Sequence, residues 1–542
     1  MHPDPHHRIS TVLAAALAAG VVGDILLRGT PWGINFPLWT AAVVTILLAT
    51  ARRLAAPLPA GYAPVAAATI LTGAMLALRD AADLSFWNAA ASLAGIGLMA
   101  SRTRSGSLTR TGVAEAAGNL FLQGIYAWCG SLLLGFSIFK ARKEGGGGFL
   151  PERWGGILRG AAVAVPALLL FGGLLTAADP GFQYLVEEVL HIDLDTVVSH
   201  ILLTGFLAWL AAGFLHFRFS TVETLFTGAP PLRRMQAGPT ELAMLLGSLD
   251  LLFAVFVLVQ IPYFFGGHGA VLGNAGLTYA EYARRGFFEL ITVAAIALPL
   301  LLGAEWVLRR DQPRDAMRFR GLALLMLMLL LVMLASAAHR LQLYTSAYGL
   351  TPARVHAAAV LVWLAFTLLW FAATVLRGKR ERFFYGAVMA AYAFLLLLNA
   401  VNPDALVARV NIRRFATTGA FDAPQAARLG AEAVPALLDS INSFPPADRD
   451  VLARSFLARY DTQRAGRGWK SWNAALGEAE QAVADRKGEL QGMLIPRKSP
   501  QARHEEAGGE ARSRAAPQGR ETTPASASPA ATRRCCGYAR TG

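Results

Sequence analysis

The sequence predicts an all-α protein, a polytopic membrane bundle of 11–12 transmembrane helices that carries a small soluble helical region and a disordered tail. Apolar residues make up 54% of the 542 residues and charged residues only 16%, against about 25% charged in soluble domains. The apolar residues gather before Asn402 in runs of roughly 17 to 25 residues, long enough to cross about 30 Å of hydrocarbon. This pattern excludes a soluble enzyme, a secreted disulfide scaffold and an ordinary nucleic-acid-binding protein.

Twelve apolar runs are candidates for these helices. Each is expected to be helical because backbone groups in lipid must find hydrogen-bond partners within their own segment. The alternation typical of an outer-membrane barrel is absent. The runs are 9–27, 36–51, 62–78, 84–101, 119–139, 157–177, 198–217, 243–265, 286–308, 321–338, 355–376 and 383–401.

The connectors of the second half differ strongly in charge. Seventeen Lys and Arg residues lie in the connectors 140–159, 218–234, 309–320 and 377–382, whereas the loops between them hold four. The positive-inside rule places the seventeen in the cytoplasm. The run 383–401 then leads outward, and the chain after it is expected on the extracytoplasmic side.

The first half conflicts with twelve simple crossings. A crossing helix at 119–139 would place the basic residues of 102–110 and of 140–143 on opposite faces. We therefore favour a segment 119–139 that is re-entrant or lies along the cytoplasmic interface, where Tyr126 and Trp128 are at home. This gives eleven crossings with the N-terminus inside. Twelve crossings with the N-terminus outside is the alternative.

Composition divides the chain into five parts. N-terminal membrane helices occupy 1–140, a Gly-rich linker 141–156, and a second membrane module 157–402. Helical start signals and amphipathic patterns continue through 403–495, which predicts a small soluble bundle. From 496 to 542 large apolar residues are nearly absent, so this tail is expected to be disordered.

Three segments carry a family resemblance: TYAEYARRGFFEL (278–290), HRLQLYTSAYGLTPARV (339–355) and LNAVNPDALVARVNI (398–412). Together they resemble a bacterial family of multi-pass membrane proteins catalogued as a domain of unknown function, numbered four-one-seven-three. The resemblance covers roughly half or more of the chain, from about residue 150 to 440. It implies a bacterial inner-membrane protein, and it transfers no activity, ligand or catalytic residue.

One ionisable residue lies deep within an apolar run. Asp250 is about 10 Å inside the run 243–265, by the helical rise. An ionisable group at that depth suggests a function, because its insertion costs roughly 2.5–3.5 kcal/mol. Asp250 is interpreted as a proton or cation site, or as a structural carboxyl that joins two helices.

Polar residues also gather on the predicted outer face, where the positive-inside rule disfavours arginine. One hypothesis is an outward-facing site whose guanidinium groups receive a phosphate or carboxylate, flanked by tyrosines. The alternative is that the arginines pair with acidic residues and pin the external loops together. The residues of this predicted Arg/Tyr cluster are Arg284, Arg285, Arg340, Arg354, Tyr279, Tyr282, Tyr344, Tyr348, Glu281 and Glu289.

No motif assigns a reaction. Phosphate-loop, nucleophile-elbow and zinc-protease patterns are missing, and the three cysteines have no metal-ligand spacing. We expect no catalytic residue, no metal and no cofactor, and an enzyme is the least favoured class. The favoured function is transporter-like or lipid- and anion-handling, with membrane lipids, an anionic small molecule or a lipid headgroup as partner and no nucleic acid. The alternative is a membrane-anchored scaffold or sensor whose helical tail binds a partner.

Overall fold

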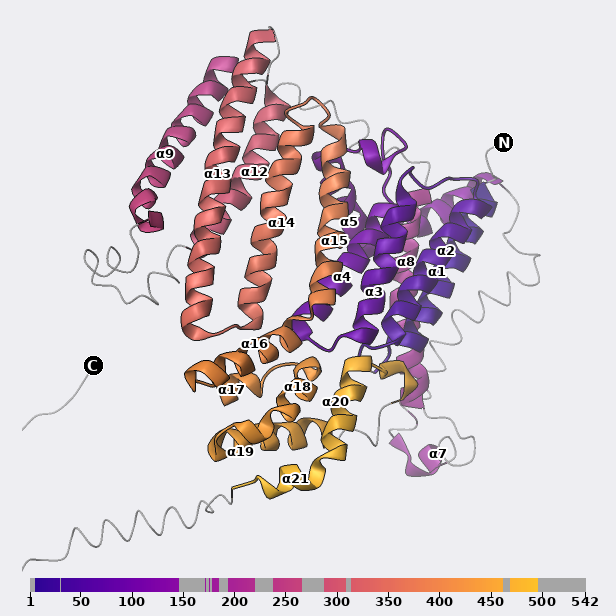
Figure 1. Ribbon diagram of the computed structural model, residues 1–542. Helices are drawn as coiled ribbons and strands as arrows, with labels where there is room; N and C mark the ends of the chain where they lie inside the picture. Colours follow the sequence, from indigo (N-terminus) through magenta and orange to yellow (C-terminus); the bar gives the residue numbers. More distant parts are fainter. Residues whose placement is uncertain are drawn as a thin grey trace, which may run out of the picture. The chain divides into compact units, whose positions relative to one another are not determined.

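The computed structural model describes residues 5–29, 31–145, 178–184, 194–219, 237–265, 287–308, 313–461 and 468–495, together with residues 171 and 175. The linker after 145, the run 157–177 apart from two positions, and the tail 496–542 lie outside the described residues. The all-α prediction is confirmed. Figure 1 shows long helices side by side, with shorter helices of the C-terminal part at one end of them.

The long helices match the predicted runs closely, and eight of the described helices are long and apolar enough to cross a membrane. The chain is therefore an integral membrane protein. The long helices are α1 (Pro5–Leu27), α2 (Asn35–Arg53), α3 (Tyr62–Leu78), α4 (Ala82–Met99), α5 (Val113–Gly145), α8 (Leu194–Phe219), α9 (Pro239–Phe265), α12 (Phe287–Val307), α13 (Pro313–Tyr348), α14 (Pro352–Thr374) and α15 (Glu381–Val401).

Two apolar cores hold these helices together. One joins α1, α2, α3, α4, α5 and α8, with side chains of α15 against it. The other joins α9, α12, α13 and α14. Helix α15 packs against α14 on one side and against α3 and α4 on the other, where Asn88 and Asn399 exchange amide hydrogen bonds of 2.9 Å. Helix α8 thus packs with the N-terminal helices, although it follows the predicted linker in sequence.

The two ends of the bundle differ in composition. At one end, here called the basic end, α2 finishes with Arg52 and Arg53, and Arg218 at the end of α8 donates to the carbonyl of Pro57. At the opposite end, here called the docking end, α1, α3, α13 and α15 finish and the C-terminal helices begin. The N-terminal end of α1 and the C-terminal end of α15 thus lie at opposite ends of the bundle. This arrangement agrees with the favoured odd number of crossings, and the number of crossings itself stays a prediction.

The segment 119–139 lies within helix α5, which has a long contact with α8. Helix α5 packs antiparallel along α8, with Tyr126 against Phe217 and the Trp209 indole donating to the carbonyl of Trp128. The close approach depends on glycine: a Cβ on Gly213 would lie 2.0 Å from the carbonyl oxygen of Tyr126. Whether 119–139 crosses the membrane stays a prediction.

The predicted helical region 403–495 is mainly helical over its described residues, 403–461 and 468–495. Its elements are α16 (Pro403–Thr418), α17 (Ala423–Ala426), α18 (Val434–Asp439), α19 (Pro446–Phe456), α20 (Ala474–Asp485) and α21 (Lys487–Gly492), with short turns that include η6 (Trp469–Ser471). We call this part the C-terminal domain. Its core includes Leu437, Phe444, Leu452 and Phe456, all almost fully buried.

Side-chain to backbone hydrogen bonds fasten the C-terminal domain to the docking end. Asn473 donates to the carbonyls of Leu76 and Arg79, at the end of α3. Glu432 accepts the backbone N–H groups of Asp80 (2.7 Å) and Ala81 (3.3 Å). Because these bonds satisfy backbone groups at helix ends, the C-terminal domain completes the docking end.

Candidate functional site

The predicted Arg/Tyr cluster is only partly described. Tyr279, Glu281, Tyr282, Arg284 and Arg285 lie outside the described residues. Glu289 is described in the first turn of α12, where its side chain is exposed. No described contact joins Glu289 to the other members of the cluster.

Arg354, Tyr344 and Tyr348 do come together, at the turn between α13 and α14. The Arg354 guanidinium lies 4.1 Å from the centroid of the Tyr344 ring, and Tyr344 packs against Tyr348. The same guanidinium donates to the carbonyl of Gly349, whose φ of +79° forms the turn. Arg354 therefore stabilises a turn, and this contact fits the alternative in which the arginines pin the loops.

The C-terminal domain forms hydrogen bonds with the backbone of this turn. The Asn411 amide donates to the carbonyl of Leu350 and accepts its N–H, at 2.8 and 2.9 Å. Arg414 donates to the carbonyl of Ala347. Arg340 lies earlier on α13 and is half-buried. Arg354, Tyr344 and Tyr348 of the predicted cluster thus lie at a turn where the membrane helices contact the C-terminal domain.

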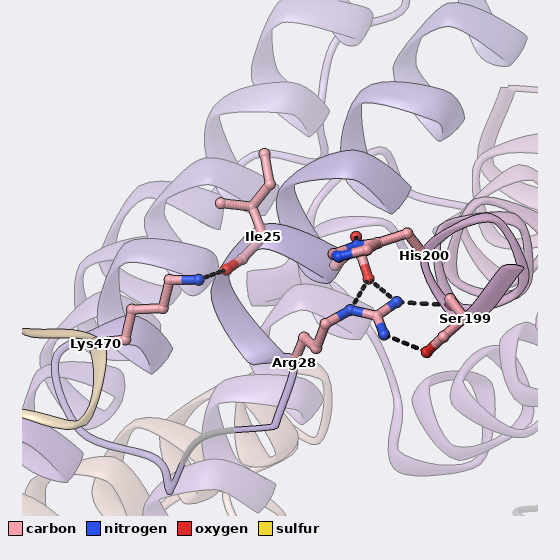
Figure 2. Close-up of polar contacts among 6 residues, drawn as sticks. Ile25, Arg28, Ser199, His200 and Lys470 are labelled. Atoms are coloured by element: carbon pink, nitrogen blue, oxygen red, sulfur yellow. Dashed lines mark hydrogen bonds and ion pairs between the residues drawn. The ribbon is translucent and has the colours of Figure 1, made fainter. Parts of the chain in front are cut away.

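A different group of charged residues lies between α1 and α8, and the sequence did not predict it. Asp24, in the last turns of α1, is almost fully buried. Its carboxylate accepts from Arg28 Nε at 2.7 Å and lies 2.5 Å from His200 Nδ1. Figure 2 shows Arg28 facing Ser199 and His200 across the two helices.

Arg28 is positioned by several contacts. Its Nη1 donates to the Ser199 hydroxyl, and its Nη2 donates to the Ser199 carbonyl at 2.7 Å and lies 2.5 Å from Asp24. With the Nε bond, three of the five guanidinium N–H groups donate hydrogen bonds, and the Nη2 contact with Asp24 is an ion pair. Among the described residues, one N–H of Nη1 is left for a ligand. The side chain is 24% exposed, so a ligand can reach it.

An open groove of about 600 Å³ lies directly beside this guanidinium. Apart from Arg28 and Ser199, side chains of α8 line it: Val198, Leu202, Leu203 and Phe206. The groove therefore has one charged end and an apolar wall. That wall is exposed on a membrane-spanning helix, where the surrounding phase is hydrocarbon.

The C-terminal domain contributes a second cation to this region. Lys470, in η6, donates to the carbonyl of Ile25 at 2.6 Å, one turn before Arg28 on α1 (Figure 2). The neighbouring Trp469 and Trp472 are exposed, as is Trp32 between α1 and α2. Exposed indole rings at the end of a membrane bundle are typical of the headgroup level. We call Asp24, Arg28, Ser199, His200 and Lys470 the α1–α8 site.

A weak signal in the sequence indicated this site. Asp24 and Arg28 stand four residues apart at the end of an apolar run, the spacing of an ion pair on one helix face. Asp24 by itself, near the end of its apolar run, can also reach water without a partner. His200 and Ser199 are more than 170 positions away, and nothing in a single sequence pairs α1 with α8.

Asp250, the predicted intramembrane residue, lies on α9 and is 3% exposed. Neither of its carboxylate oxygens has a hydrogen-bond partner. It is remote from the α1–α8 site, because α9 belongs to the second core. Within the described residues no group of His, Cys, Asp and Glu side chains is arranged to hold a metal ion.

Comparison with known proteins identifies a family. No curated protein and no solved structure matches the chain. A family model described as a domain of unknown function, DUF4153, matches residues 66–440, which is more than half of the chain. The resemblance found in the sequence is confirmed, with four-one-five-three as the family number in place of four-one-seven-three. The chain belongs to the family described as domain of unknown function DUF4153.

Proposed function

We propose that this protein binds the headgroup of an anionic membrane lipid at the α1–α8 site and handles that lipid at the docking end of the bundle. The observation that carries this proposal is the position of Arg28, which stands at the charged end of an apolar, lipid-facing groove. An acyl chain fits the wall formed by Leu202, Leu203 and Phe206, while the phosphate meets the guanidinium. This combination selects an amphiphile with a negative head.

The charge balance of the α1–α8 site favours an anion. Asp24 offsets the charge of Arg28, and Lys470 then leaves the site with one net positive charge when His200 is neutral. Protonation of His200 adds a second positive charge. His200 is half-exposed, so it can contact a headgroup directly.

We further propose that the basic end faces the cytoplasm of a bacterial cell and that the α1–α8 site lies on the extracytoplasmic face of the inner membrane. Basic side chains at helix ends support this orientation: Arg52, Arg53, Arg102 and Arg218 all belong to the basic end. The C-terminal domain is then extracytoplasmic, as the sequence predicts. The lipid is one that reaches the outer leaflet of that membrane.

The test is lipid binding by the full-length protein in detergent, followed by native mass spectrometry with phosphatidylglycerol and phosphatidylcholine of equal chain length. We expect preferential binding of phosphatidylglycerol, and weakening of that binding by Arg28→Gln. Loss of a charge-assisted hydrogen bond of about 1.5–3 kcal/mol corresponds to about 10- to 100-fold in affinity. The matched control is Arg53→Gln, at the basic end, which should bind phosphatidylglycerol like the natural protein.

A second variant tests the groove independently of whether Arg28→Gln folds correctly. Leu202 lies on the groove wall and is 67% exposed, so Leu202→Trp keeps the charged residues and fills the groove. It should weaken the binding of phosphatidylglycerol without lowering the thermal midpoint of unfolding. Equal affinity for both lipids in the natural protein, or unchanged affinity in both variants, would contradict the proposal.

A further inference from the structure

Asp250 lies near the middle of the membrane-spanning helix α9, and no residue in the described part of the chain pairs with its carboxyl group. It is eleven residues into α9, about 16 Å along the helix axis. Its carboxyl group is 3% exposed, and neither oxygen accepts or donates a hydrogen bond. Its position therefore differs from that of Asp24, which is equally buried but is held by Arg28 and His200.

The surroundings of Asp250 are apolar. Helix α9 packs against α13, and the residues of α9 next to Asp250 on that side, Leu249 and Phe253, belong to the apolar core. Ala323, Met326 and Leu327 of α13 lie in the same core. The titratable groups of α13 stand nearer to its two ends: Arg314, Asp315, Arg318, Arg320, His339, Arg340, Tyr344 and Tyr348.

A second polar position lies further along the same pair of helices. Gln260 is buried, and its side-chain oxygen accepts the hydroxyl of Ser336 on α13. The Gln260 Nε2 atom has no partner. Ten residues separate Gln260 from Asp250, or about 15 Å toward the docking end. Two incompletely satisfied polar groups therefore lie between α9 and α13, one deep in the membrane and one nearer the docking end.

We propose that Asp250 is a proton-binding site within the membrane: its carboxyl group holds a proton in this conformation and exchanges it when water or a polar group reaches it. An ionised carboxylate in apolar surroundings without a counter-charge is strongly disfavoured, whereas the neutral acid loses far less on burial. The ligand is a proton and not a metal cation. A metal ion bound through oxygen needs several further ligands, and the described neighbours of Asp250 offer none.

The Gln260–Ser336 pair indicates the end of the bundle with which Asp250 exchanges its proton. Gln260 Nε2 can donate to a water molecule and Ser336 can both donate and accept, so the pair can support water between Asp250 and the docking end. Protons are therefore expected to exchange with the docking end, and the lipid-binding proposal is independent of this inference.

Hydrophobic carbodiimide labelling tests the proposal directly. Dicyclohexylcarbodiimide partitions into the membrane and reacts with carboxyl groups that carry a proton. We expect adducts on Asp250 in the full-length protein in liposomes, mapped by peptide mass spectrometry, and a decline of labelling as the pH rises. Asp24 is the internal control, because it is buried but ion-paired, and it should stay unlabelled.

An isosteric variant provides a second readout. Asp250→Asn resembles the neutral acid in shape and charge, so it should fold and melt within the error of the natural protein. Ser336→Ala should slow the labelling of Asp250 at fixed pH by removing one of the polar groups that support water. Absence of carbodiimide adducts on Asp250, equal labelling of Asp24, or a large loss of thermal stability in Asp250→Asn would overturn the proposal.

Discussion

Asp24 and His200 are 176 positions apart in the chain, and Asp24 Oδ2 lies 2.5 Å from His200 Nδ1. Their contact joins the first membrane helix to α8 at the docking end. Close helix packing makes the contact possible: a Cβ on Gly20 would lie 2.6 Å from the carbonyl oxygen of Thr204. The charged end of the lipid-facing groove is thus built by helix packing and not by a local motif.

Removal of the Asp24 charge should destabilise the α1–α8 pair. Asp24→Asn keeps the size of the side chain but replaces charge-assisted hydrogen bonds to Arg28 and His200 by neutral ones. We expect a loss of about 1–3 kcal/mol in unfolding free energy, observed as a lower thermal midpoint in detergent. Asp83→Asn is the control, because the Asp83 side chain is 68% exposed and its ion pair with His356 is long. Equal midpoints for both variants would show that the buried pair adds nothing.

The α5–α8 contact should depend on Gly213 and not on Gly205, although both lie on α8. Gly213→Ala places a methyl group against the backbone of Tyr126 and should force the helices apart, which lowers the thermal midpoint. Gly205, on the same helix, has no atom near the position of an added Cβ. Gly205→Ala should be neutral, or stabilising by up to about 1 kcal/mol through helix propensity. A neutral Gly213→Ala would contradict the packing of α5 along α8.

The docking of the C-terminal domain should strengthen at mildly acidic pH. Burial raises the pKa of Glu432 and of Asp404, whose Oδ2 accepts the N–H of Gly430 at 2.6 Å. An acid whose pKa is raised on folding binds more protons in the folded form. Stability is then highest below the ordinary carboxyl pKa, falls as the pH rises toward the raised pKa, and levels off above it.

Hydrogen exchange of the turn between α3 and α4 measures this effect across the range from about pH 5 to pH 7, which lies above the ordinary carboxyl pKa values. After correction for intrinsic exchange, protection of the Asp80 and Ala81 amides should fall with rising pH. Glu432→Gln should flatten that dependence, because the glutamine amide does not titrate. Its side-chain oxygen still accepts both N–H groups, so the docking contact is kept. Glu478→Gln, at an exposed position, should leave it unchanged. A steeper dependence in Glu432→Gln would refute the assignment.

The proposed orientation can be tested with one engineered thiol. Tyr348 is exposed at the docking end. In a background in which Cys129, Cys535 and Cys536 are replaced by serine, Tyr348→Cys should react with a membrane-impermeant maleimide in intact spheroplasts. A thiol at Arg53, at the basic end, should react only after lysis. The reverse pattern would place the C-terminal domain in the cytoplasm.

Much of the membrane fold follows from hydropathy alone. The run 62–78 coincides with α3, and 383–401 differs from α15 by two residues at its start. Such agreement is expected because the length of a membrane helix is set by the hydrocarbon thickness. The sequence did not predict that 119–139 packs lengthwise along α8. Contacts with α8 decide its place, and these contacts depend on packing at glycine.

The candidate site was less predictable than the fold. Arg354 belongs to the predicted Arg/Tyr cluster, and in the structure its guanidinium donates to the carbonyl of Gly349 in the turn. The four-residue spacing of Asp24 and Arg28 is present in the sequence but was not singled out, and Ser199 and His200 come from a helix whose neighbours no periodicity reveals. Depth in the membrane can be read from a sequence, and that identified Asp250. Contacts between distant helices need the folded structure.

Photochemical labelling tests the lipid-binding proposal most directly. A phosphatidylglycerol that carries a diazirine in its acyl chain is reconstituted with the full-length protein, irradiated, and its adducts are mapped by peptide mass spectrometry. We expect adducts on α8 between Val198 and Phe206, few adducts there with the matched phosphatidylcholine probe, and a marked decrease in Arg28→Gln. Equal labelling of that stretch by both probes, unchanged by Arg28→Gln, would contradict a headgroup site at the α1–α8 junction.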